Sequence, residues 1–82
     1  MRIKYSDQAL KFLTKQDAKR IVSKIEQYTE DPMALQNQVK KLTNSMYFRL
    51  RIGDYRVIFS ETGEVMKIEK IGNRGDVYRE YR

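Results

Sequence analysis

Apolar residues recur three or four positions apart through the first third of the chain, after one short strand. The strand is predicted over residues 2–5, and Ser6 and Asp7 then provide side chains that cap helices. A second helix is predicted from about Gln16, and Asp31-Pro32 ends it because the residue before a proline avoids the helical region. The apolar positions are Ala9, Leu10 and Leu13 in the first helix, and Ala18, Ile21, Val22, Ile25 and Tyr28 in the second.

From residue 46 onward apolar and polar residues alternate, which is the pattern of half-buried strands. The predicted strands are Met46–Ile52, Tyr55–Phe59 and Val65–Ile71. Residues 33–45 follow neither period and are interpreted as an irregular connector. The fold class is therefore α+β: a small β-α-α-β-β-β domain over residues 1–82, in which a helical hairpin packs on one face of an antiparallel sheet.

The pairing of the first two of these strands follows from the loop between them. Gly53-Asp54 fits a two-residue hairpin, with glycine at the position of a type II′ turn that needs positive φ. Loop length sets the register of a hairpin, so Arg51 is opposite Arg56 and Arg49 is opposite Ile58. Since side chains alternate between faces, one face is apolar and the other is not. The apolar face holds Phe48, Leu50, Val57 and Phe59, and the other face holds Tyr47, Arg49, Arg51, Arg56 and Ile58.

This second face concentrates positive charge. Directly opposed like charges destabilise a sheet by up to about 1 kcal/mol, so the Arg51–Arg56 pair, with Arg49 beside it, favours an anionic ligand. The guanidinium fork suits phosphate, and Tyr47 on the same face can stack on a base. The alternative is neutralisation of these arginines by carboxylates on an exposed face. The candidate carboxylates are those of Glu61, Glu64 and Glu69.

Charge and composition narrow the chemistry further. The 82 residues include 17 Lys and Arg against 11 Asp and Glu, a net charge of +6, which favours nucleic acid or an acidic protein as partner. The chain has no Cys and no His, which excludes disulfides, thiolate chemistry and a histidine base. No pair of carboxylates has a metal-binding spacing, so we expect no metal and no cofactor. Without an apolar run of about 18 residues or a signal segment at the start, we expect no membrane span and a cytoplasmic location.

Two segments together carry a resemblance to a known family. YFRLRIGDYRVIF over residues 47–59 and KIGNRGDVYR over residues 70–79, with Lys41-Leu42 before them, closely resemble the RelE/ParE toxin superfamily of bacterial type II toxin–antitoxin systems. The resemblance covers nearly the whole chain and implies the element order derived above. The superfamily includes ribosome-dependent messenger-RNA endonucleases and inhibitors of DNA gyrase, so the resemblance leaves the activity open between the two.

For the endonucleases, the resemblance implies a metal-free cut in which the 2′-hydroxyl of one nucleotide attacks its own 3′-phosphate. The matching catalytic residues are Arg49, Arg56, Arg74 and Tyr78. The chain departs from the pattern in two places, because Tyr47 stands where the family has a lysine and Asn73 where many relatives have histidine. Additional RNA or phosphate contacts are expected from Arg51, Tyr47, Lys40 and Lys41.

The leading hypothesis is thus a toxin that cleaves messenger RNA on the ribosome and is neutralised by a cognate, acidic antitoxin. Its expected partners are the antitoxin, the ribosome and messenger RNA. One alternative is a toxin that inhibits DNA gyrase without being a nuclease. Another is a catalytically inactive module that binds nucleic acid or protein.

Overall fold

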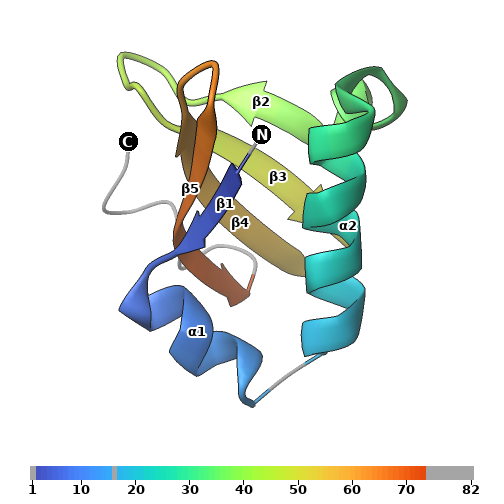
Figure 1. Cartoon of the computed structure of the whole chain (residues 1–82), viewed down its shortest axis with the longest axis vertical. Coiled ribbons are helices and arrows are strands. Elements are labelled where there is room, and N and C mark those ends of the chain that lie inside the picture. The colour runs from blue at the N-terminus through green and yellow to red at the C-terminus, as the bar shows by residue number, and fades with distance from the viewer. Residues whose placement is uncertain (1, 16, 74–82) are drawn as a thin grey trace.

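A five-stranded sheet forms the centre of the molecule, with the strand order β1-β5-β4-β3-β2 (Figure 1). The computed structural model describes residues 2–15 and 17–73. The strands and helices, in chain order, are β1 (Arg2–Tyr5), α1 (Asp7–Leu13), α2 (Ala18–Glu30), the 3-10 helix η1 (Pro32–Gln38), β2 (Val39–Lys41), β3 (Phe48–Ile52), β4 (Tyr55–Glu61) and β5 (Val65–Asn73). The predicted α+β class and the predicted order of elements are confirmed.

The sheet is mixed rather than antiparallel throughout. β3, β4 and β5 pair antiparallel in chain order, as expected, and β2 pairs antiparallel with β3, but β1 lies parallel to β5 at the edge. Residues 2–5 have an alternating pattern with Ile3 and Tyr5 packed inward, and such a pattern is the same for either direction of pairing. The direction of this edge strand is therefore set by where the chain enters the sheet.

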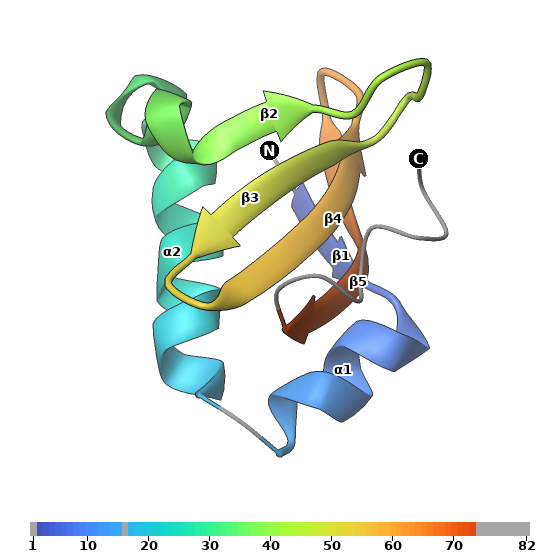
Figure 2. The ribbon, with the colours of Figure 1, turned by 180° about the vertical axis from the view of Figure 1, so that it is seen from behind.

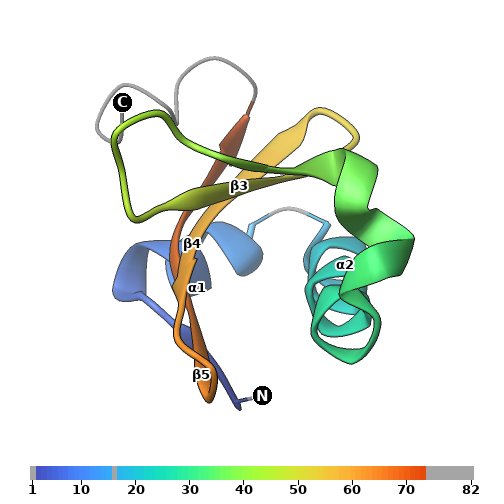
Figure 3. The same cartoon turned by 90° about the horizontal axis from the view of Figure 1, so that it is seen from above.

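Both α-helices lie on one face of the sheet, as predicted (Figure 3). The N-terminal cap of α1 is the expected one, because Ser6 Oγ accepts a hydrogen bond from the backbone N–H of Ala9 at 3.1 Å. The two helices run in steeply different directions (Figure 1). The apolar stripe of α2 is buried through Ile21, Ile25 and Tyr28. Within the described ranges, no helix is long and apolar enough to span a membrane.

The segment interpreted as an irregular connector contains two regular elements. Pro32 opens η1 at its first turn, and β2 then adds a fifth strand, in which Val39 pairs with Leu50 and Lys40 with Arg49. Three residues are too few to reveal an alternating pattern. β2 forms because β3 offers an unpaired edge and because Val39 packs against the core.

The β3–β4 hairpin has the predicted register at each of its five residue pairs. Gly53 has φ 59° and no other residue of the turn has positive φ, which fits the type II′ prediction. Phe48, Leu50, Val57 and Phe59 pack in or against the core under the helices, as the pattern requires. The local turn chemistry therefore decides which side chains of both strands face away from the helices.

A β-bulge interrupts β5. Ile58 of β4 pairs with Lys70 and the next residue pairs with Ile68, so Glu69 is the extra residue. The bulge lets Ile68 and Ile71, three positions apart, both reach the core. It coincides with the bend of β5 in Figure 1.

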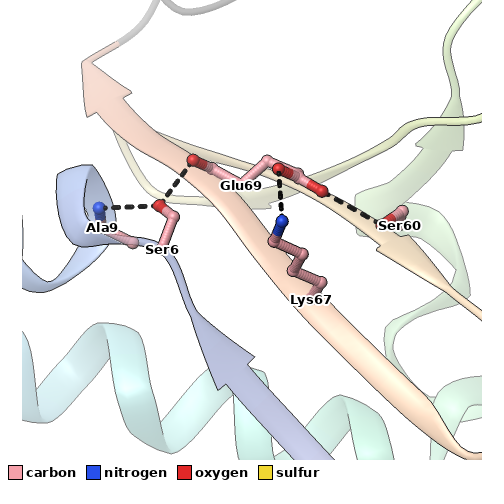
Figure 4. Close-up of polar contacts among 5 residues, drawn as sticks. All are labelled: Ser6, Ala9, Ser60, Lys67 and Glu69. Carbon is pink, nitrogen blue, oxygen red and sulfur yellow. Dashed lines mark hydrogen bonds and ion pairs between the residues drawn. The ribbon is translucent and has the colours of Figure 1, made fainter.

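Ser6 joins three elements at this bulge (Figure 4). Besides capping α1, its hydroxyl donates a hydrogen bond to the backbone carbonyl of Glu69 at 2.7 Å. One short side chain thus fixes the end of β1, the start of α1 and the bulged part of β5.

We predict that Ser6→Ala lowers the free energy of unfolding by about 1–2 kcal/mol, because the helix loses its cap and the Glu69 carbonyl loses a donor. Urea denaturation measures the change. Ser23→Ala is the matched control, since Ser23 is an exposed serine on α2. Equal stabilities of the two variants would contradict the role given to Ser6.

A second prediction concerns Tyr28, whose hydroxyl donates to the carboxylate of Glu61 at 3.3 and 3.4 Å. Burial, with the Glu61 charge and hydrogen bond adding to it, raises the pKa of Tyr28 to about 12. The folded-state pKa lies above the unfolded value, so this contribution to stability is present below pH 10 and is lost as the pH rises from about 10 to 12. Tyr28→Phe should flatten that loss in denaturation curves recorded across this range. A loss as steep as in the unsubstituted protein would disprove the assignment.

Candidate functional site

The face of the sheet opposite α1 and α2, which we call the open face, carries the predicted arginines. Arg49 and Arg56 lie on the same face, and Arg51 is directly opposite Arg56 across the hairpin. The register of the other strands adds lysines to this face from β1, β2 and β5. Its basic residues are Lys4, Lys40, Arg49, Arg51, Arg56, Lys67 and Lys70.

Arg56 is held firmly by the hairpin turn. Its side chain is only 8% exposed, and Nη1 donates to the backbone carbonyls of Gly53 and Tyr55, both at 3.0 Å. Its Nε–H is buried and finds no acceptor within the described residues. A buried donor in this state costs about 1–3 kcal/mol, which an added acceptor such as a phosphate oxygen relieves. Arg56 therefore supports the hairpin turn and keeps donor capacity for an anion.

The two neighbouring arginines are more exposed to solvent than Arg56. Arg49 is half-buried and Arg51 is exposed. Ile58, on the same face, is fully buried, and its direct neighbours in the sheet are Arg49 on β3 and Lys70 on β5. Long basic side chains cover apolar surface with their stems and keep their charges outward. Packing around Ile58 thus orients cations on both sides of β4.

Two of the three candidate carboxylates have partners other than the arginines of the hairpin, and the third is exposed at a turn. Glu61 accepts from Tyr28 on the helix side, and Glu64 is exposed at the turn before β5. Glu69 lies 3.8 Å from Lys67 and accepts from Ser60 at 3.3 Å (Figure 4).

Arg51 and Arg56 are the two arginines that face each other across the hairpin. In the part of the chain that the structure describes, neither Arg51 nor Arg56 has a carboxylate within 4.0 Å. The opposed charges of this pair are therefore not balanced by the residues proposed for that role.

The predicted auxiliary contacts divide between the two faces. Lys40 is in register with Arg49 and lies on the open face. Lys41 is in register with Phe48, so it belongs to the other face, apart from Lys40. The two lysines were assigned to a connector, whereas in β2 adjacent residues must point in opposite directions. Tyr47 is half-buried and lies two residues before Arg49.

Sequence reasoning missed the lysines of the outer strands. Lys70 lies beside Ile58, and Lys67 is in register with Lys4 of β1. The signal for Lys70 was available, because the spacing of Ile68 and Ile71 breaks strict alternation and indicates a bulge. The signal for Lys4 was absent, since it depends on the pairing of two strands far apart in the chain.

Arg74 and Tyr78, two of the four predicted catalytic residues, lie outside the described residues. The end of β5 is described: Gly72 is in register with Arg56, and Asn73 with Tyr55.

The hairpin turn is anchored to the start of α2. Tyr55 donates its hydroxyl to Asp17 Oδ2 at 2.9 Å and makes an edge-on contact with Phe12 at 5.8 Å. The hydrogen bond to Asp17 is the main cause that raises the pKa of Tyr55, so this hydroxyl remains a donor. Asp17 has φ 31° and uses its carboxylate here rather than to cap α2. Tyr55 therefore packs at the core edge, as predicted, and holds the hairpin turn against α1 and the start of α2.

We predict that Arg56→Lys destabilises the protein by about 1–2 kcal/mol, because an ammonium group cannot reproduce the fork that reaches both backbone carbonyls. Arg51→Lys, at the exposed partner position, should change the stability by less than about 0.5 kcal/mol. Thermal unfolding of the two variants compares them directly. A larger loss for Arg51→Lys would refute the structural role of Arg56.

Comparisons with known proteins place this fold in a family. A family model described as the ParE toxin of the type II toxin–antitoxin system parDE matches residues 3–78. Among solved structures, a chain of the archaeal RelE–RelB complex from Pyrococcus horikoshii OT3 is similar, with 32% identity, a TM-score of 0.71, and coverage of 92% of this chain and 96% of that chain. A search of curated protein sequences found no match.

Two more distant structures share the fold. One is a chain of the RelB–RelE antitoxin–toxin complex from Methanococcus jannaschii, with 21% identity, a TM-score of 0.71, and coverage of 96% of this chain and 99% of that chain. The other is YafQ from E. coli strain BL21(DE3), with 20% identity, a TM-score of 0.69, and coverage of 90% and 94%. With the family-model match over nearly the whole length, these findings confirm the resemblance, and the chain belongs to the ParE toxin family of type II toxin–antitoxin systems, within the RelE/ParE superfamily.

Proposed function

We propose that this toxin is a metal-independent endoribonuclease that cleaves messenger RNA on the ribosome and so inhibits translation. The observation that carries the proposal is the cluster of Arg49, Arg51 and Arg56 on the open face. Two features favour phosphate as its ligand. Arg51 and Arg56 have no carboxylate within 4.0 Å among the described residues, and the buried Nε–H of Arg56 has no acceptor there.

The proposed reaction is a transfer within the RNA strand. The 2′-oxygen of one nucleotide bonds to the phosphorus of its own 3′-phosphate, and the bond from that phosphorus to the 5′-oxygen of the next nucleotide breaks. The proton of the 2′-hydroxyl is removed and a proton is delivered to the departing 5′-oxygen. The products are a 2′,3′-cyclic phosphate and a free 5′-hydroxyl end, and no oxidant, metal or water enters this step.

Arginine meets one requirement of this step, which is to stabilise negative charge on the phosphate. Its charge is permanent and its donors stabilise the negative charge that develops on the phosphate oxygens, whereas it is a poor acid or base. We assign that stabilisation to Arg49, Arg56 and Arg74, and the orientation or exchange of a proton to Tyr78. A tyrosine in this role needs nearby cations, because its ordinary pKa is about 10.

We assign the alignment of the RNA substrate to the ribosome. A site of arginines holds a phosphate but does little to orient the attacking 2′-hydroxyl, and alignment supplies a large share of many rate enhancements. Tyr47 could contribute by stacking on a base. This division of work explains how the toxin could act without histidine, and we expect the activity in the cytoplasm, where messages are translated.

We propose a cognate antitoxin as the protein partner. Two of the similar structures are RelE–RelB complexes of a toxin with its antitoxin. An acidic segment would complement the lysines and arginines of the open face, and covering that face would block RNA directly.

A second candidate function is inhibition of DNA gyrase. The observation that favours it is the family-model match, which is to ParE toxins. Such a toxin would act through protein contact and cut no RNA. DNA breaks that depend on gyrase, with intact messages, would identify this activity.

The deciding experiment maps message ends by primer extension after expression of the toxin. We expect cuts within translated codons, and a loss of about 10²–10³ in cleavage rate of ribosome-bound message for Arg49→Ala and Arg56→Ala, by analogy with the removal of one donor to a developing oxyanion. Tyr78→Phe should also slow cleavage. Lys19→Ala removes an exposed cation from α2 and should cleave normally. Undiminished cutting by both Arg56→Ala and Tyr78→Phe, in folded protein, would reject the proposal.

A further inference from the structure

A second cationic site lies at the outer edge of β3, away from the centre of the open face. A pocket of about 220 Å³ opens between α2, η1 and the hairpin turn. Figures 1 and 2 show η1 at the C-terminal end of α2 and the hairpin turn beside α2. Its basic wall is formed by Arg20 and Lys24 of α2, and Arg51 lines it at the edge of β3, with its side chain on the open face. Leu50 and Ile52, both buried, form part of its floor. Neither the proposed reaction nor the family motifs assign a role to this pocket.

The pocket exists because β2 is short. β2 pairs with β3 only up to the pair Val39–Leu50, so Arg51–Gly53 has no strand neighbour on that side among the described residues. η1 and the first two turns of α2 enclose this gap instead. The result is a recess with a rigid floor, rather than a flat charged surface.

Gly53 determines how one of the cations is held. A Cβ at this position would lie 2.5 Å from Nη2 of Arg20, so the guanidinium rests directly against the backbone of the turn. A side chain at residue 53 would displace it. The glycine required by the turn geometry therefore also allows Arg20 to reach the pocket.

The three basic residues of the pocket form no close ion pair among the described residues. In the described chain, Arg20, Lys24 and Arg51 have no carboxylate within 4.0 Å. Lys24 donates a hydrogen bond to the neutral amide of Gln27 at 3.5 Å. Asp17, one turn from Arg20, accepts the hydroxyl of Tyr55. The like charges of Arg20 and Lys24 beside one small recess repel each other, and an anion bound there would offset that repulsion.

Gln38 contributes a hydrogen-bond acceptor that needs a donor from the ligand. Its side chain also lines the pocket, and its Oε1 is buried without a partner among the described residues. The ligand that meets both needs carries a phosphate for the cations and a hydroxyl for the amide. The pocket volume suits one ribose with its phosphate.

We propose that this pocket binds a ribose–phosphate unit of RNA, as an anchoring site separate from the phosphate that undergoes cleavage. Arg51 lies at the pocket and also opposite Arg56 on the open face, so one RNA strand can contact both places. An acidic peptide is the competing ligand. It is disfavoured because the unpaired edge of Arg51–Gly53 is too short for a strand to add. The assignment to RNA rests on the proposed function, but the binding itself does not require cleavage.

Binding of a short single-stranded RNA, followed by fluorescence anisotropy over a series of salt concentrations, tests the site. Arg20→Gln with Lys24→Gln keeps most of each side chain and removes both charges. We expect about tenfold weaker binding, and a salt slope that is smaller by about 0.7 for each phosphate that the variant no longer neutralises. Lys19→Gln, an exposed neighbour on α2 outside the pocket, should bind normally. Lys24→Gln alone, which leaves the Arg20–Gly53 contact intact, should weaken binding without changing the thermal unfolding temperature.

Three outcomes would overturn the proposal. One is unchanged RNA affinity in the folded double variant, and another is a loss confined to an acidic probe peptide such as oligoglutamate. The third is an equal loss for DNA of the same sequence, which would remove the assignment to ribose. RNA binding measured in the same way for Arg49→Ala separates the endonuclease proposal from the pocket proposal. If messages remain intact in cells but RNA binding still depends on Arg20 and Lys24, the endonuclease proposal fails and the pocket assignment stands.

Discussion

The pairing of β3 with β4 across the Gly53–Asp54 turn is the constraint on which the rest of the molecule depends. With two residues in the loop, each strand has one possible register, and that register sends four apolar side chains toward the helices. The same pairing must then place three arginines on the opposite face. A slip by one residue would bury the arginines and expose the core, so stability of the fold and assembly of the cationic surface cannot be separated.

Arg56 combines a structural role with the chemical role that we propose for it. Two of its hydrogen bonds close the turn that sets the register, and its remaining buried donor is directed to no atom of the described chain. The buried Nε–H without an acceptor costs stability, but a guanidinium already held in place needs little reorganisation when an anion binds. Tyr55, tied to Asp17 and packed on Phe12, stiffens the same turn from the helix side. The site is therefore built on the most constrained part of the sheet.

The basic surface consists of two parts that meet at Arg51. The open face offers cations in a row across the strands, suited to an extended anionic chain. The pocket at the edge of β3 offers a recess suited to one phosphate group. A surface of this form can hold RNA at more than one point, which favours a defined path of the strand over a loose electrostatic contact.

The sequence by itself determined the features that depend on neighbours in the chain. The Ser6 cap, the stripe of α2 and the complete hairpin register, with Arg49, Arg51 and Arg56 on one face, follow from local spacing and turn chemistry. Tertiary structure decided what depends on distant partners: the parallel pairing of β1, the added strand β2 that separates Lys40 from Lys41, and the burial of Arg56. The edge pocket belongs to this second group, because its cations come from residues 20, 24 and 51 and are neighbours only after α2 packs beside β3. Local patterns determine on which face of a strand or helix a side chain lies. Its burial, and its distance from residues far away in the chain, depend on how the helices and strands pack together.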